Sequence, residues 1–66
     1  MTLEYIGRDG WDRPIYKSEG RIYVDIDPSG THPAIHTKSS NEIDGEPARP
    51  VNDTAFIFQP ARDTWK

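Results

Sequence analysis

The strongest constraint on the fold is an alternation of β-branched with charged or aromatic side chains in residues 21–26, directly after a glycine-containing turn. A period of two residues is typical of a β-strand, because successive side chains point to opposite faces. The pattern predicts a core face that consists of Ile22, Val24 and Ile26. The opposite face is predicted to consist of Arg21, Tyr23 and Asp25. Gly20 adopts positive φ without a steric penalty, so residues 17–21 are predicted to turn the chain. Together these features predict a β-hairpin from Trp11 to Ile26.

A proline limits the first strand of this hairpin. Pro14 has no backbone N–H to donate, so the strand is expected either to be an edge strand or to begin at Pro14. Before it, the segment at residues 7–10 contains two glycines. These glycines predict a turn or bulge that ends a short strand at residues 2–6.

Two further short strands are predicted at residues 34–38 and 55–58, the first of them antiparallel to the second strand of the hairpin. The polar segment between them contains Pro47 and Pro50, which exclude a continuous helix. A single helical turn near residues 40–43 is compatible with the sequence. The sequence therefore predicts one domain over the whole chain, mainly β, built as a small antiparallel β-meander of three to four strands with loose termini.

The size and composition predict a small core. A chain of 66 residues buries only about 60% of the surface that its unfolded form exposes. The hydrophobic fraction is 33% and there is no cysteine, so no disulfide or thiolate zinc site reinforces the core. No apolar run approaches the roughly 20 residues that span a bilayer, and no signal segment follows Met1. We therefore expect a cytoplasmic protein without membrane contacts.

The charge pattern argues against general nucleic-acid binding. The net charge is −3, and the eight Lys and Arg residues are scattered along the chain. Backbone binding to nucleic acids relies on clustered basic residues, which this sequence lacks. The charge is also too small and too mixed in sign for an acidic mimic of nucleic acid. The acidic segment at residues 41–47 is interpreted as a solvated loop, or alternatively as an attractor for a basic partner or a cation.

One segment matches the first half of a calcium loop. In residues 25–30, Asp25 and Asp27 stand at alternate positions before Gly30. The twelfth position of such a loop would be His36, where calcium loops have a bidentate Glu. An Asp-Pro-Ser-Gly turn at the end of a strand explains the same residues. The alternative function is therefore a Ca²⁺- or Zn²⁺-binding accessory domain that uses Asp25, Asp27 and His36, and no cofactor is assigned.

Catalytic motifs are not found. The serines lie in turn-like sequence without the G-x-S-x-G context of a nucleophile elbow. The five glycines do not have the spacing of a phosphate-binding loop. His32 and His36 are separated by Pro33, and residues four apart on an extended segment lie about 13 Å from each other. We therefore expect a protein that is not an enzyme.

The segment around Trp11 favours a binding surface. Trp and Arg dominate the energetics of protein interfaces, and Arg13 and two Tyr side chains follow Trp11 in the hairpin. The predicted partner-binding residues are Trp11, Arg13, Tyr16 and Tyr23. Alternatively, Trp11 covers one end of the small sheet. The expected partner is another protein, whose identity and stoichiometry the residues do not give.

The same segment carries a family resemblance. One ordered pattern of residues carries it, namely Tyr5-Ile6-Gly7-Arg8-Asp9, Trp11-Asp12-Arg13-Pro14 and Tyr16-Lys17, followed by Gly20 and Asp44-Gly45-Glu46-Pro47. In this pattern, which extends over residues 5–51, the chain resembles small uncharacterised proteins of clostridial and other Gram-positive genomes. Some of those proteins are carried on conjugative transposons or phage-like elements. The resemblance implies a β-rich fold and a mobile genetic element, and it brings no activity and no site residue.

Overall fold

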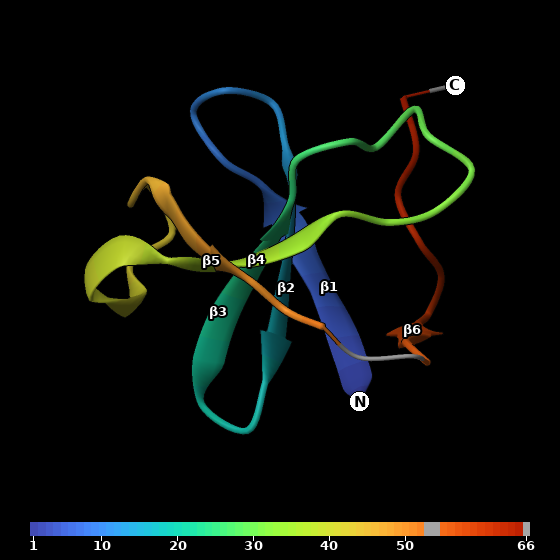
Figure 1. The fold of residues 1–66 in the computed structure, drawn as a ribbon, viewed down its shortest axis with the longest axis horizontal. Helices are drawn as coiled ribbons and strands as arrows, with labels where there is room; N and C mark the ends of the chain where they lie inside the picture. Colours follow the sequence, from blue (N-terminus) through green and yellow to red (C-terminus); the bar gives the residue numbers. More distant parts are fainter. Residues whose placement is uncertain (53–54, 66) are drawn as a thin grey trace.

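Six strands form a single mixed sheet in the computed structural model, which describes residues 1–52 and 55–65 (Figure 1). The elements are β1 (Thr2–Arg8), β2 (Pro14–Ser18), β3 (Arg21–Asp25), β4 (Ile35–Lys38), the 3₁₀ turn η1 (Ser39–Asn41), β5 (Pro47–Pro50) and β6 (Ile57–Gln59). The strand order is β5-β4-β3-β2-β1-β6. Neighbours from β1 to β5 pair antiparallel, whereas β6 pairs parallel to β1. The mainly β class is confirmed.

The predicted antiparallel meander is correct for β1 to β5, which pair in chain order, but the prediction of three to four strands is wrong, and β6 adds a parallel pairing. The strand predicted at residues 55–58 is observed in part as β6, whereas β5 was not predicted. β5 contains Pro47 and Pro50, which rule out a helix but are compatible with the edge of a sheet. β6 closes the other edge beside the N-terminal strand, with the N–H of Ile57 donating to the carbonyl of Met1 at 2.9 Å. For the described residues, the expectation of loose termini is also wrong, because β1 lies inside the sheet and residues 62–65 are held by side-chain hydrogen bonds; Lys66 lies outside the described residues.

The central hairpin of β2 and β3 is confirmed. Ser18 pairs with Arg21, which leaves Glu19 and Gly20 as a two-residue connection. Their φ angles are 49° and 80°, and two positive values in succession define the type I′ turn that matches the twist of paired strands. β2 begins at Pro14, which is the second of the two alternatives predicted for the strand that contains this proline. The predicted antiparallel pairing of β4 with β3 is also observed.

A bulge interrupts β1 at Gly7, as the glycines predicted. The register with β2 shifts between Tyr5 and Gly7, and Gly7 has a φ of 129°, which L side chains rarely adopt. A bulge of this kind bends a strand and redirects the residues that follow it. The redirected residues are Arg8 and Asp9, whose side chains bond to the loop that follows β1.

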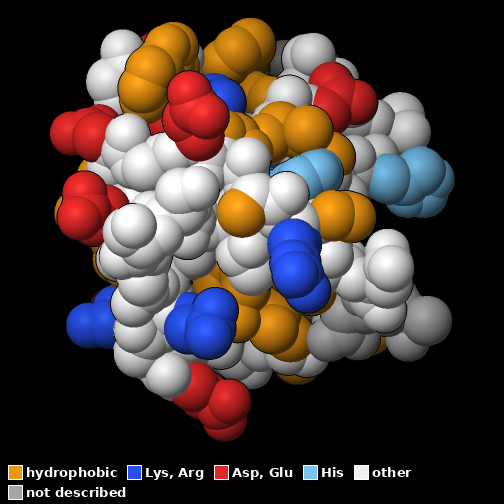
Figure 2. All heavy atoms as spheres, turned by 60° about the vertical axis from the view of Figure 1, so that its left-hand side comes forward, with side chains coloured by type: hydrophobic (Ala, Val, Ile, Leu, Met, Phe, Trp, Pro, Cys, Tyr) orange, Lys and Arg blue, Asp and Glu red, His pale blue; other side chains and the backbone are white. Residues whose placement is uncertain are grey.

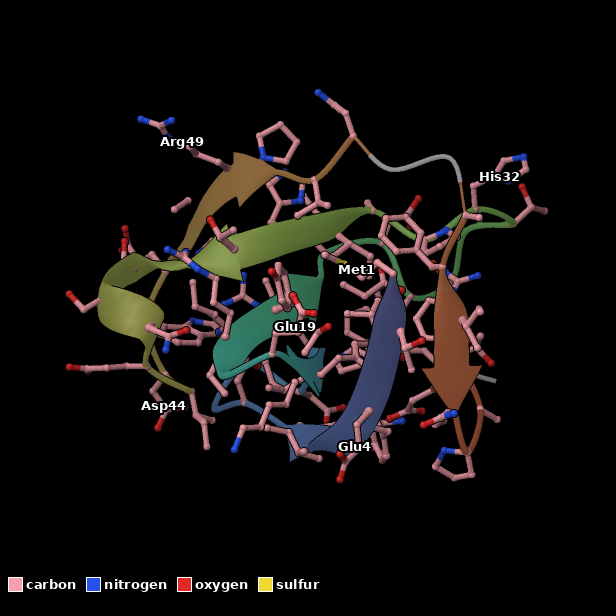
Figure 3. All side chains as sticks on the ribbon, turned by 90° about the horizontal axis from the view of Figure 1, so that it is seen from below. Met1, Glu4, Glu19, His32, Asp44 and Arg49 are labelled. Atoms are coloured by element: carbon pink, nitrogen blue, oxygen red, sulfur yellow. The ribbon has the colours of Figure 1, made fainter. Side chains whose placement is uncertain are left out.

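The core lies inside the curl of the sheet. Its buried residues are Leu3, Tyr16, Tyr23 and Ile35, with Tyr5, Val51, Phe56 and Phe58 packed against them. The ring of Tyr16 contacts Phe58 edge-on at 5.0 Å between centroids and Tyr5 at 5.7 Å. Figure 3 shows the side chains that fill the space between β1 and β6 on one side and β4 and β5 on the other. A sheet that curls in this way encloses a core without a second layer.

The predicted core face of β3 is wrong in part. Tyr23, assigned to the opposite face, belongs to the core, and Ile26 is 42% exposed. Val24 is buried together with its register partner Ile15, but on the other side of the sheet. Both faces of the central strands are therefore covered, so alternation alone could not tell which side holds the core.

The described residues contain no helix that is long and apolar enough to cross a membrane.

Candidate interaction surface

The loop between β1 and β2 is built around the carboxylate of Asp9. Its Oδ1 accepts the backbone N–H groups of Trp11 and Arg13, both at 2.9 Å. Its Oδ2 accepts Nε of Arg13 at 3.0 Å. The backbone of Asp12 has a φ of 64°, a conformation that Asp tolerates better than most residues. This network fixes the position from which Trp11 projects.

A buried lysine joins the loop to β4. Nζ of Lys38 donates to Oδ2 of Asp9 at 2.7 Å and to the carbonyl of Gly45 at 2.9 Å. Neither side chain of the ion pair is exposed to solvent. Burial by itself raises the pKa of Asp9, but hydrogen bonds from Lys38, Arg13 and Trp11 together outweigh it and hold that pKa below its ordinary value. Asp9 is therefore a charged anchor and not a proton donor.

Trp11 lies over this ion pair and remains 58% exposed. The guanidinium of Arg13 lies 5.0 Å from the centroid of its ring, and Nζ of Lys38 lies 6.0 Å away. Both are within the range of a cation–π contact. Of the two alternatives for Trp11, the exposed position is the one observed, and the ring is held in place by its two cationic neighbours.

A second tryptophan reaches the same loop from the far end of the chain. Nε1 of Trp65 donates to the carbonyl of Asp12 at 2.8 Å, and Trp65 is 49% exposed. The carboxylate of Asp12 accepts Nη1 of Arg8 at 3.0 Å. We call the set of Trp11, Asp12, Arg13 and Trp65 the tryptophan surface. Trp65 was missed from the sequence, because nothing local to it indicates that it lies beside Asp12.

The two tyrosines predicted to bind a partner lie elsewhere. Tyr16 is wholly buried and Tyr23 is 7% exposed, and both belong to the core cluster. Their assignment to a partner-binding surface is corrected, because rings inside the core do not reach a second protein. The hydroxyl of Tyr16 accepts the backbone N–H of Asp63 at 2.9 Å. The pKa of the Tyr16 hydroxyl is raised, chiefly by burial. Of the predicted set, Trp11 and Arg13 remain.

The carboxylate of Asp63 links the C-terminal segment to Arg8 and Tyr5. Arg8 donates to both of its carboxylate oxygens, from Nε at 2.8 Å and from Nη2 at 2.9 Å, and the hydroxyl of Tyr5 donates at 2.6 Å. These hydrogen bonds, from Arg8 first and then Tyr5, lower the pKa of Asp63 to about 2. The same contact with Asp63 raises the pKa of Tyr5. Asp63 therefore stays ionised over the whole physiological range.

The loop that resembled a calcium site holds an internal cation instead. Oδ1 of Asp25 accepts the N–H groups of Asp27 and Ala34, both at 3.0 Å. Its Oδ2 accepts Nε of Arg62 at 3.2 Å. The same guanidinium donates to the carbonyl of Gly30 at 2.9 Å and to that of Asp27 at 3.0 Å. One carboxylate oxygen of Asp25 and the backbone carbonyls of Asp27 and Gly30 are thus bonded to Arg62.

The histidines do not join this loop into a larger cluster. Nδ1 of His36 lies 3.1 Å from the carbonyl of Ala34, within its own strand region. Figure 3 shows His32 at the periphery of the molecule, pointing away from the body. Within residues 1–52 and 55–65, no group of three or more His, Cys, Asp or Glu side chains is placed to hold a metal ion.

Comparison with known proteins gives no further assignment. No family model, curated protein or solved structure matches this chain. A functional proposal therefore rests on its own residues.

The surroundings of the tryptophan surface are acidic. The N–H of Gly10 donates to the carboxylate of Asp44 at 3.0 Å, which fixes the acidic turn after η1 against the loop that carries Trp11. That turn exposes Glu42, Asp44 and Glu46, and Ile43 is 49% exposed between them. Figure 2 shows hydrophobic and acidic side chains side by side on the upper part of one face, while most basic side chains lie lower. The acidic turn therefore borders the loop that carries Trp11.

Proposed function

We propose that this protein is a small non-catalytic interaction module that binds another protein through the tryptophan surface. The observation that carries the proposal is the position of Trp11. A ring that is more than half exposed is held over a fully buried ion pair by two cationic side chains. Trp and Arg are the residues most enriched among those that carry the binding energy of interfaces.

The rigidity of the loop supports this role. Binding loses affinity when loops and side chains must be ordered on contact. Here the backbone on both sides of Trp11 is already fixed by Asp9, and Trp65 is fixed by its hydrogen bond to Asp12. The ordering cost is therefore small for the two largest exposed side chains of the surface.

The shape of the described part of the chain favours a protein over a small molecule as the ligand. Small-molecule sites are concave and enclose most of the ligand surface. Residues 1–52 and 55–65 enclose no pocket. An aromatic surface without a pocket suits a broad, complementary protein surface.

The charge distribution indicates the chemistry of that partner. The exposed carboxylate of Asp44 lies against the loop of Trp11, while Arg13 and Lys38 are already paired with Asp9. Complementary potential steers association and selects partners. The proposed partner therefore presents an apolar centre with basic residues beside it. If the chain is encoded on a mobile element, as the family resemblance implies, proteins encoded next to it are the first candidates.

The alternative of a Ca²⁺- or Zn²⁺-binding domain has less support. Among the described residues, Asp25, Asp27 and His36 do not form a group of three that could hold a metal ion, and Arg62 already donates to one carboxylate oxygen of Asp25 and to the carbonyl of Asp27. Titration of the protein with each metal, followed by amide NMR shifts of residues 25–36, tests this alternative directly.

The interaction proposal is tested by replacing exposed side chains one at a time. Trp11→Ala should weaken the binding of candidate partners at least about tenfold, the size of a moderate interface contribution. Ile57→Ala is the matched control, because Ile57 is equally exposed at 58% and lies on β6 outside the tryptophan surface. Affinity is measured by calorimetry with candidates found by pull-down, and an NMR spectrum of each variant verifies the fold. A partner that binds Trp11→Ala as tightly as the wild type would contradict the proposal.

A further inference from the structure

The segment at residues 60–65 is attached differently from the rest of the chain. It follows β6, the last strand, and none of its described residues pairs in the sheet. Figure 1 shows it running from β6 along the side of the molecule, past the loop between β3 and β4. None of its residues is buried. It is held mainly by polar groups of Arg62, Asp63 and Trp65.

The body of the domain offers a specific acceptor site for the arginine. The guanidinium of Arg62 donates to a carboxylate oxygen of Asp25 and to the carbonyls of Asp27 and Gly30. Asp25 is wholly buried, and the turn that presents the two carbonyls is closed by the N–H of Gly30 donating to Asp27 at 3.1 Å. A planar fork of donors thus meets three fixed oxygens, which a lysine would not reproduce.

A second site of opposite charge receives the next residue. Arg8 donates to the carboxylate of Asp63 from two nitrogens, and the hydroxyl of Tyr5 also donates to it. The hydroxyl of Tyr16 accepts the backbone N–H of the same residue. The carbonyl of Asp12 then accepts the indole N–H of Trp65. The body of the domain therefore provides an acidic site for the arginine, a basic site for the aspartate and a carbonyl acceptor for the indole. These sites have the same order as the residues of an Arg-Asp-x-Trp segment.

We propose that this surface is a peptide-recognition site for an Arg-Asp-x-Trp segment, filled here by the chain's own residues 62–65, and that the same segment of a second copy can take their place. The second copy is the occupant because its C-terminal segment has the side chains, charges and spacing that the structure shows seated in the site. This inference does not depend on the function proposed above.

The mode of attachment makes exchange feasible. Regions with few buried apolar contacts and no sheet hydrogen bonds open at lower free energy than the core. The chain's own segment is favoured over a second copy because it is tethered, at an effective concentration in the millimolar range for short flexible tethers. Exchange is therefore expected at high protein concentration, or when the chain's own segment is weakened.

Hydrogen exchange on the wild-type protein tests the release. The N–H of Asp63 is protected by the hydroxyl of Tyr16, whereas the N–H groups of β2 and β3 are protected by sheet pairing. If the segment opens by itself, the N–H of Asp63 exchanges at least about a hundredfold faster than the slowest amides of β3. Exchange of Asp63 at the same rate as β3 would show that the segment leaves only on global unfolding, and would overturn the proposal.

Binding in trans tests the site. The probe is a synthetic peptide of residues 59–66, added to the full-length variant Arg62→Ala/Asp63→Ala, in which the competing segment is weakened. The expected result is a saturable shift of the amides of Arg8, Asp25 and Gly30. A peptide in which both charged residues are replaced by Ala should bind at least about tenfold more weakly, and a peptide with Arg62→Lys should also lose affinity because the fork is lost. No shift at millimolar peptide, or equal binding of all three peptides, would refute the site. If the double variant does not fold, Asp63→Asn alone serves as the receptor under the same criteria.

Discussion

Nζ of Lys38 lies 2.7 Å from Oδ2 of Asp9, and neither side chain is exposed to solvent. The pair links β4 to the loop between β1 and β2 and lies beneath the exposed ring of Trp11. A buried ion pair is an uncertain source of stability, since the loss of hydration offsets the attraction between the charges. Its clearest effect here is positional, because the loop that presents Trp11 is folded around Asp9.

Lys38→Met should destabilise the protein strongly. It removes the buried ammonium group and leaves the carboxylate of Asp9 with Arg13 as its remaining charged partner. Breaking a buried pair from one side typically lowers the free energy of unfolding by about 3–5 kcal/mol. Chemical denaturation measures the change. Lys17→Met, at an exposed lysine of β2, is the matched control and should change stability by less than about 0.5 kcal/mol. A similar small effect at Lys38 would contradict the importance of the pair.

Tyr16→Phe should show a smaller loss of about 1 kcal/mol. The substitution keeps the ring in the core but removes the hydroxyl that accepts the N–H of Asp63. Tyr23→Phe is the control, because its ring lies in the same core cluster but the N–H of Asp63 bonds to Tyr16 instead. Thermal unfolding of the two variants compares them, and equal melting temperatures would speak against the contact.

The protein should lose stability in acid partly through Asp63. The pKa of Asp63 is lowered to about 2 in the folded state, below the value of about 3.9 of a free Asp side chain. A lowered folded pKa contributes stability above the unfolded value, and this contribution is lost as pH falls from about 4 to about 2. The lowered pKa of Asp9 acts in the same direction. Asp63→Asn should therefore reduce the decrease in the free energy of unfolding between about pH 4 and about pH 2. Glu4→Gln, at an exposed carboxylate, is the control and should leave this decrease unchanged.

Gly45→Ala should disturb the turn that lies against the tryptophan surface. A Cβ at this position would collide with the backbone carbonyl of Ser39, which cannot move aside as a flexible side chain could. The carbonyl of Gly45 also accepts Nζ of Lys38. The expected loss is about 1–3 kcal/mol. Gly10→Ala is the control, since its nearest contact would be the carboxylate of Asp44 at an ordinary 3.5 Å. Denaturation of both variants decides whether the collision matters.

Local features of the fold could be predicted because their causes are local. The turn at Glu19 and Gly20 and the bulge at Gly7 follow from backbone conformations that depend on neighbouring residues. The exclusion of a helix around Pro47 and Pro50 has the same origin. For the candidate surface, the side-chain chemistry of Trp and Arg led to the prediction of Trp11 and Arg13, and the structure places Trp11 in an exposed position.

Other predictions were wrong because their causes are distant in the chain. The burial of Tyr16 and Tyr23 depends on the curl of a sheet whose edges come from both ends of the sequence. The parallel pairing of β6 with β1 joins segments more than fifty residues apart, as the bond from Ile57 to Met1 shows. No pattern within either strand specifies such a partner.

The sequence by itself determined the β character of the chain, the central hairpin and the presence of a Trp-Arg segment, since period, turn chemistry and residue type act over a few residues. Only the tertiary structure decided that Trp11 stays exposed over a buried ion pair, that Trp65 joins it, and that Arg62 fills the loop of Asp25. Those contacts connect residues that are 29, 53 and 37 positions apart. Contacts over such separations form only when the whole sheet brings the segments together.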